Sequence, residues 1–188
     1  LRMIGDMLDL TRIEAGGLAL QIEPVGLAAL ARHALEMVRA DAERAQVALV
    51  LVAADEITVP ADRTRLLQIL FNLLGNAIKY NRPGGRVALT LQRAADGLVE
   101  MRVQDNGVGI AEADLPQVFE PFQRGHQAGG SVDGAGIGLA VTRSLVLLMG
   151  GTITARSVPG EGSEFCARLP LADLPTQGEP PADPYSST

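Results

Sequence analysis

The sequence predicts an α+β fold, a two-layer sandwich in which one mixed β-sheet is covered on one face by α-helices. Three observations predict it. The chain has 188 residues, enough for little more than one domain. Its 47% hydrophobic and 20% charged residues are typical of a folded globular chain. The expected elements follow in the order helix, strand, helix, hairpin, long loop, helix, hairpin, which favours helices packed on one mixed sheet.

The helices are predicted by apolar residues three and four positions apart. This spacing covers residues 1–15, 27–45, 62–80 and 137–149. Glycine pairs follow the first and the last of these segments, and Pro83-Gly84-Gly85 follows the third, as expected where helices end.

The strands are predicted by apolar runs and by alternation. Val47–Val52 is a continuous apolar run and predicts a strand buried on both faces. Residues 18–24 and 58–61 are expected to be extended. Alternating apolar residues predict one hairpin over 87–103, with its turn at Asp96-Gly97, and a second over 152–169.

Composition excludes several functions. A net charge of −6 argues against sequence-independent nucleic-acid binding, and the single cysteine excludes an internal disulfide framework. No apolar run approaches the roughly 20 residues that span a bilayer. Within this acidic chain, residues 60–100 carry a net positive charge. The excess suits a small anionic ligand, and an ordinary fluctuation of surface charge explains it equally well. The chain opens at Leu1, inside an amphipathic pattern, and we expect it to be a piece of a longer protein.

The third helix carries the most informative polar residues. With 100° per residue, Asn72, Asn76 and Lys79 lie in one narrow stripe opposite a broad apolar arc. A solvated helix face is one interpretation. However, asparagine is a poor helix former, whereas amide oxygens suit Mg²⁺ and an ammonium suits phosphate. Tyr80 follows, as a core aromatic or as a ring that stacks on a base.

Two glycine clusters flank a long loop. Asp105-Asn-Gly-Val-Gly-Ile110 follows a strand, where Asp105 would accept from an exocyclic amine or form an ordinary Asx turn. Residues 134–139 open a helix and offer backbone N–H groups to an anion, although they are not a P-loop. Between the clusters, both rings of Phe119-Glu-Pro-Phe122 are expected to anchor the loop, which leaves Arg124 to reach a phosphate.

Taken together, these segments resemble the ATP-binding domain of sensor histidine kinases. The N box is residues 72–81, the first glycine box 105–110, the F box 119–122 and the second glycine box 134–139, and residues 7–16 resemble the end of the family's dimerisation hairpin. The resemblance implies a Bergerat ATP fold over residues 21–170. It also implies the end of the second hairpin helix and a connector over 1–20. The proline-rich sequence without apolar periodicity predicts a linker or tail over 171–188.

The resemblance also implies a set of site residues. Asn72 and Asn76 would hold Mg²⁺ and phosphate oxygens, and Lys79 and Arg124 would meet the phosphates. Tyr80 would flank the base, and the Asp105 carboxylate would accept a hydrogen bond from the adenine amino group. Residues 111–133 would form a lid over ATP. The remaining nucleotide-binding positions would be Gly107, Gly109, Ile110, Gly134, Gly136, Gly138 and Leu139, of which the last three glycines would hinge the lid.

The implied reaction is transfer of the γ-phosphoryl group of ATP to a histidine. His33 and His126 both lack the family's acceptor context, so we expect the acceptor on a dimerisation domain upstream of Leu1 and no self-labelling. The resemblance further implies a response-regulator receiver domain as partner, a homodimeric full-length protein, and a cytoplasmic location for this domain.

Three alternatives to histidine phosphorylation stay open. The first is ATP hydrolysis, which is disfavoured because related ATPases of this fold carry a glutamate at the position of Asn72, and an amide cannot act as the general base for hydrolysis. A non-catalytic nucleotide-sensing or docking module is disfavoured by the intact boxes. An anti-sigma serine kinase is disfavoured by the helical lead-in.

Overall fold

A computed structural model describes residues 2–53, 57–123 and 136–171. The elements in chain order are α1 (Arg2–Glu14), β1 (Glu23–Gly26), α2 (Leu27–Ala45), β2 (Ala48–Ala53), β3 (Thr58–Ala61), α3 (Arg63–Lys79), β4 (Arg86–Arg93), β5 (Leu98–Asp105), the 3₁₀ turn η1 (Leu115–Gln117), α4 (Gly138–Leu148), β6 (Thr152–Val158) and β7 (Gly162–Pro170).

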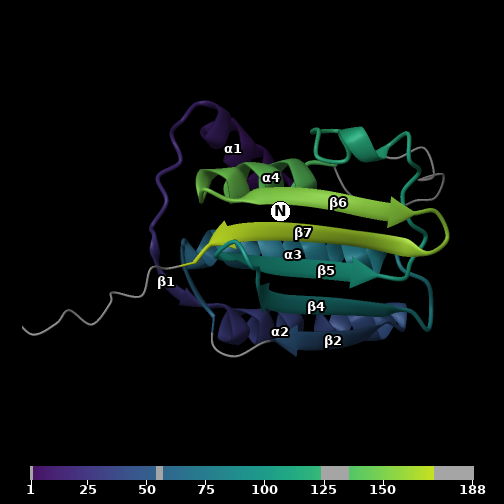
Figure 1. Ribbon diagram of the computed structural model, residues 1–188. Coiled ribbons are helices and arrows are strands. Elements are labelled where there is room, and N and C mark those ends of the chain that lie inside the picture. The colour runs from purple at the N-terminus through teal and green to yellow at the C-terminus, as the bar shows by residue number, and fades with distance from the viewer. Residues whose placement is uncertain (1, 54–56, 124–135, 172–188) are drawn as a thin grey trace, which may run out of the picture.

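A five-stranded mixed sheet forms one layer, in the order β2-β4-β5-β7-β6. Only β2 and β4 are parallel, and the other neighbours are antiparallel. Helices α2, α3 and α4 lie together on one face of the sheet, and α1 lies beside α4 (Figure 1). The predicted α+β sandwich is confirmed, and all four helices form within one residue of the expected bounds.

The strand expected at residues 58–61 forms as β3, whereas in the expected extended segment 18–24 a strand begins only at Glu23. β1 and β3 pair with each other in a separate two-stranded sheet. Pro24 and Pro60 lie opposite each other in that pair. Proline has no backbone N–H to donate, so this ladder is short.

A correction concerns β2. The apolar run 47–52 is expected to be buried on both faces, but Val52 is 50% exposed and no residue of β2 is fully buried. The reason is its place at the edge of the sheet. It pairs with β4 on one side only, and the helices cover a single face.

Helix α3 begins at a strong cap. The Asp62 carboxylate accepts from the backbone N–H groups of Thr64 and Arg65, both at 3.0 Å, and its second oxygen accepts from the Gln21 N–H at 3.0 Å. Most of the apolar arc of the helix, including Leu66 and Leu70, is fully buried. The cap and the arc together fix the rotation of α3, and therefore where its polar stripe points.

Among the residues that the model describes, no helix combines the length and apolar character needed to cross a membrane.

Candidate functional site

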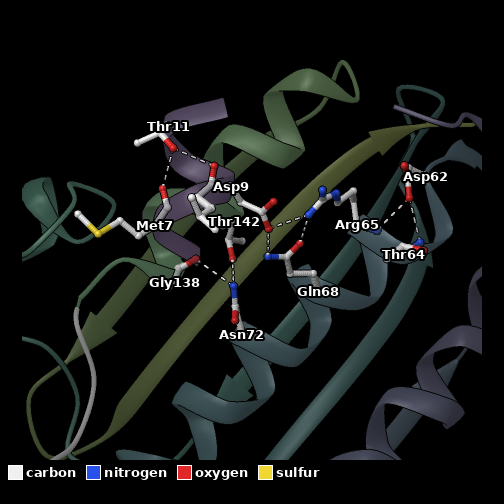
Figure 2. Close-up of polar contacts among 11 residues, drawn as sticks. Met7, Asp9, Thr11, Asp62, Thr64, Arg65, Gln68, Asn72, Gly138 and Thr142 are labelled. Atoms are coloured by element: carbon white, nitrogen blue, oxygen red, sulfur yellow. Dashed lines mark hydrogen bonds and ion pairs between the residues drawn. The ribbon is translucent and has the colours of Figure 1, made fainter. Parts of the chain in front are cut away.

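The polar stripe of α3, which Arg65 and Gln68 extend toward the N-terminus, has three parts, and the first of them contacts α1. The Asp9 carboxylate on α1 accepts from the Arg65 guanidinium at 2.7 Å and from the Gln68 amide at 3.0 Å (Figure 2). Arg65 also donates to the Gln68 side-chain oxygen at 2.9 Å. The N-terminal half of the stripe therefore holds the lead-in helix.

The middle of the stripe contacts α4. The Asn72 side-chain nitrogen donates to the Gly138 carbonyl at 3.2 Å and to the Thr142 hydroxyl at 3.4 Å. Figure 2 shows this nitrogen turned toward α4 and the amide oxygen turned away from it. The contact joins the N box directly to the second glycine box.

The C-terminal half of the stripe stays accessible. Asn76 is half-buried, and its side chain has no hydrogen bond within residues 2–53, 57–123 and 136–171. The Lys79 ammonium lies 5.0 Å from the centre of the Tyr80 ring. Tyr80 is 39% exposed, so it is not a core aromatic. This end of α3 presents an amide, a cation and a partly exposed aromatic ring.

The first glycine box lies against that end of α3. The Val108 N–H donates to the Tyr80 carbonyl at 3.1 Å. Asp105 is the last residue of β5 and is only 8% exposed. Its Oδ1 accepts from the N–H groups of Gly107 at 2.8 Å and Ser163 at 3.3 Å.

Burial raises the pKa of Asp105, and the two backbone hydrogen bonds oppose that shift. Both of these bonds go to Oδ1. Among the described residues, no hydrogen bond is made to Oδ2, so this oxygen is an acceptor available to a ligand.

The glycines of the first box are required by the chain itself. A Cβ at Gly107 would overlap the Tyr80 carbonyl oxygen, and one at Gly109 would overlap the Val158 carbonyl oxygen. Gly109 also has a φ of +71°. These residues bring the loop into backbone contact with α3 and with the β6–β7 turn. Space for a nucleotide remains a separate prediction.

Three supporting residues were missed by the sequence reasoning. Gly162 has a φ of +119°, and a Cβ there would overlap the Asp105 carbonyl oxygen. Ser163 donates its N–H to Asp105, and the Ser157 hydroxyl, 2.9 Å from that of Ser163, accepts from the Ile110 N–H at 2.7 Å. The available signal was Gly162-Ser163 directly after a turn, which we had interpreted only as hairpin sequence.

The described ends of the long loop meet. The Phe122 N–H donates to the Gly136 carbonyl at 3.0 Å, and Gly136 has a φ of +68°. Phe119 anchors the loop as expected, with its ring edge-on to Phe165 at 6.1 Å. The same expectation is wrong for Phe122, which is 61% exposed and whose backbone lies in the left-handed region, at φ +64°.

Other predicted positions are placed as follows. Leu139 and Ile110 are partly buried against the core. His33 is exposed on α2. Arg124, His126 and Gly134 lie outside the described residues, as does most of the second half of the predicted lid.

A groove of about 410 Å³ adjoins the site at Asn72 and runs along the N-terminal half of α3. Polar and apolar side chains from α1, α2 and α3 line it: Asp9, Met37, Thr64, Leu67, Gln68, Phe71 and Asn72.

Comparisons with known proteins match the same boxes. A family model described as histidine kinase-, DNA gyrase B-, and HSP90-like ATPase matches residues 61–173. The virulence sensor protein BvgS of Bordetella bronchiseptica is 39% identical over 199 residues, covering 100% of this chain and 16% of BvgS. The circadian input-output histidine kinase CikA of Synechococcus elongatus is 39% identical over 188 residues, covering 96% of this chain and 24% of CikA.

A solved structure is similar over most of the chain. The crystal structure of full-length ShkA in complex with AMPPNP has a TM-score of 0.80 and 32% sequence identity, covering 90% of this chain and 35% of ShkA. The chain spans 16% of BvgS and 24% of CikA, the two curated relatives described above. The chain therefore belongs to the family of histidine kinase-, DNA gyrase B- and HSP90-like ATPases, and its ATP-binding catalytic domain is of the sensor histidine kinase type.

Proposed function

We propose that this chain binds ATP between the C-terminal half of α3 and the first glycine box and transfers the γ-phosphoryl group to a histidine on another segment. The observation that carries the proposal is the Asp105 carboxylate. It is buried at the end of β5, it is held through one oxygen, and its other oxygen is available as an acceptor.

The chemistry of these groups fits a purine triphosphate. Asp105 Oδ2 would accept from the exocyclic amino group of adenine, and a fixed, buried acceptor discriminates well against bases without that donor. Tyr80 would flank the base. The Lys79 ammonium would meet the phosphates, and Arg124 and the backbone N–H groups of residues 134–139 would supply further donors to them.

The residues also fit a magnesium ion. Amide oxygens are hard ligands, and the part of the chain that the structure describes makes no hydrogen bond to Asn76 Oδ1 or Asn72 Oδ1. When bound, Mg²⁺ supplies positive charge to the phosphate oxygens. The residues of the chain would position these charges, which is the main protein contribution to phosphoryl transfer.

Transfer is favoured over hydrolysis by the nature of Asn72. Its amide nitrogen is committed to α4, and an amide has no basic group that could activate water. Within the described residues the one histidine is His33, exposed on α2 and outside the family's acceptor context. We therefore place the acceptor on a dimerisation domain that this chain does not contain.

The remaining elements of the proposal follow from that assignment. Residues 1–20 would be the end of the second helix of the dimerisation hairpin with its connector, 21–170 the catalytic domain, and 171–188 a linker or tail. The whole protein would act as a homodimer that passes its phosphoryl group to a response-regulator receiver domain, and the present domain would lie in the cytoplasm.

The test is a labelling reaction with ATP radiolabelled in the γ-phosphate. We expect no label on this chain alone and an acid-labile label on a separately supplied dimerisation domain of a relative. Asn76→Ala should abolish that label, whereas Glu161→Gln, in the exposed β6–β7 turn, should not. A label on His33 or His126, or release of phosphate as the main product, would overturn the proposal.

A further inference from the structure

The contact between Asn72 and α4 has the geometry of a device that orients a side chain. The Asn72 side-chain nitrogen donates to two acceptors, the Gly138 carbonyl and the Thr142 hydroxyl. These two residues lie four positions apart on one face of α4 (Figure 2). An asparagine side chain carries two donor hydrogens on its nitrogen and acceptor sites only on its oxygen. The Gly138 carbonyl and the Thr142 hydroxyl can therefore occupy both donors.

Burial makes this contact specific. Thr142 is fully buried, with 0% exposure, and a buried hydroxyl needs a hydrogen-bond partner. Asn72 is the side chain that the structure pairs with it. If the amide were reversed, its oxygen would face the Gly138 carbonyl, acceptor against acceptor. The contact thus selects one of the two orientations of the amide.

We propose that Thr142 is a positioning residue which, together with the Gly138 carbonyl, holds the Asn72 amide so that only its oxygen is offered to the metal–phosphate end of the site. This inference rests on the proposed function, because it concerns how Asn72 meets a metal-bound triphosphate. It also gives α4, which follows the second glycine box, a direct contact with the N box.

A valine at this position would have nearly the same shape without the hydroxyl. In Thr142→Val the Asn72 nitrogen keeps the Gly138 carbonyl as acceptor but loses the Thr142 hydroxyl, so the amide moves more freely and its oxygen is less firmly fixed toward the cation. A lost neutral hydrogen bond corresponds to an equilibrium change of about three- to tenfold. Thr142→Ser restores the hydroxyl and serves as the matched control.

The first measurement needs no ligand. In the nuclear magnetic resonance spectrum of the free chain, the Asn72 side-chain NH₂ signals are assigned by their absence in Asn72→Ala. We expect these signals to move and to exchange faster with solvent in Thr142→Val, and to stay unchanged in Thr142→Ser. Unchanged signals in Thr142→Val would overturn the inference. Should the valine variant fail to fold, Thr142→Ala is measured in its place.

The second measurement is the affinity for ATP with and without Mg²⁺, from which the gain due to Mg²⁺ is taken as a ratio. We expect Thr142→Val to reduce this ratio about three- to tenfold and Thr142→Ser to leave it within about twofold. A loss of affinity equal in both conditions would indicate a purely structural role and overturn the inference. If the wild-type chain binds no ATP at all, it is the proposed function that fails.

Discussion

The exchange Asp105→Asn separates the role of Asp105 in recognition from its role in the fold. The asparagine oxygen can still accept from the Gly107 and Ser163 N–H groups, so the turn is kept. Its amide nitrogen replaces Oδ2, which puts a donor where the adenine amino group also donates. One hydrogen bond to a charged group is lost, about 1.5–3 kcal/mol, and ATP affinity should fall about ten- to a hundredfold.

The free energy of unfolding of this variant at neutral pH should not fall together with its ATP affinity. Because burial raises the pKa of Asp105, the stability that its protonated form contributes is present in acid and is lost as the pH rises through the folded pKa. Asparagine is uncharged throughout. The free energy of unfolding of Asp105→Asn at neutral pH should therefore equal or exceed that of wild type, and this gain should vanish below the ordinary carboxyl pKa of 3.8.

The assay is calorimetric titration of ATP with Mg²⁺, paired with chemical unfolding of the same samples. Asp96→Asn is the matched control, because Asp96 lies in the β4–β5 turn and is paired with Arg168 at 2.8 Å, away from the glycine box. The reasoning is refuted if Asp105→Asn binds ATP within about twofold of wild type. It is also refuted if the loss of binding is matched by a loss of folded protein.

Three further predictions follow from other contacts. Asp9→Ala removes the acceptor of Arg65, so the amides of α1 should exchange with deuterium about tenfold faster while those of β5 do not, and equal rates would contradict the α1 contact. Hydrogen bonds from Gln92 and Arg102 lower the pKa of Glu100, so its stabilisation is present above 4.5 and is lost as the pH falls through the folded pKa. Glu100→Gln should thus cost about 1 kcal/mol in urea unfolding at neutral pH and nothing in strong acid, and a cost that persists in acid would refute this. Burial raises the pKa of the Cys166 thiol, so iodoacetamide should label the native chain at least tenfold more slowly than the urea-unfolded chain, and equal rates would place Cys166 at the surface.

Local patterns were sufficient to predict the helices and hairpins. In α3, the capping residue Asp62 and the apolar arc lie within a few residues of each other, so the spacing alone predicts the helix and the rotation of its polar stripe. The boxes were recognisable for a similar reason, since each is a short contiguous segment.

Non-local pairing set the limit of prediction. Whether the apolar run of β2 is buried on both faces depends on its place in the strand order, and that order is decided by distant segments. The partner of Asp105 at Ser163 is 58 residues away, and the Thr142 partner of Asn72 is 70 residues away. Periodicity predicted that Asn72 lies on the polar stripe, but it could not predict which end of the amide is exposed.

The central claim is that ATP lies between the accessible end of α3 and the first glycine box, with adenine on Asp105. Its most direct test is a crystal structure of this chain with Mg²⁺ and a non-hydrolysable ATP analogue. We predict that the adenine amino group lies within hydrogen-bonding distance of Asp105 Oδ2, with the phosphates beside Lys79 and Asn76. A nucleotide bound elsewhere, or a saturated crystal with the Asp105 carboxylate facing only the protein's own side chains, would contradict the account.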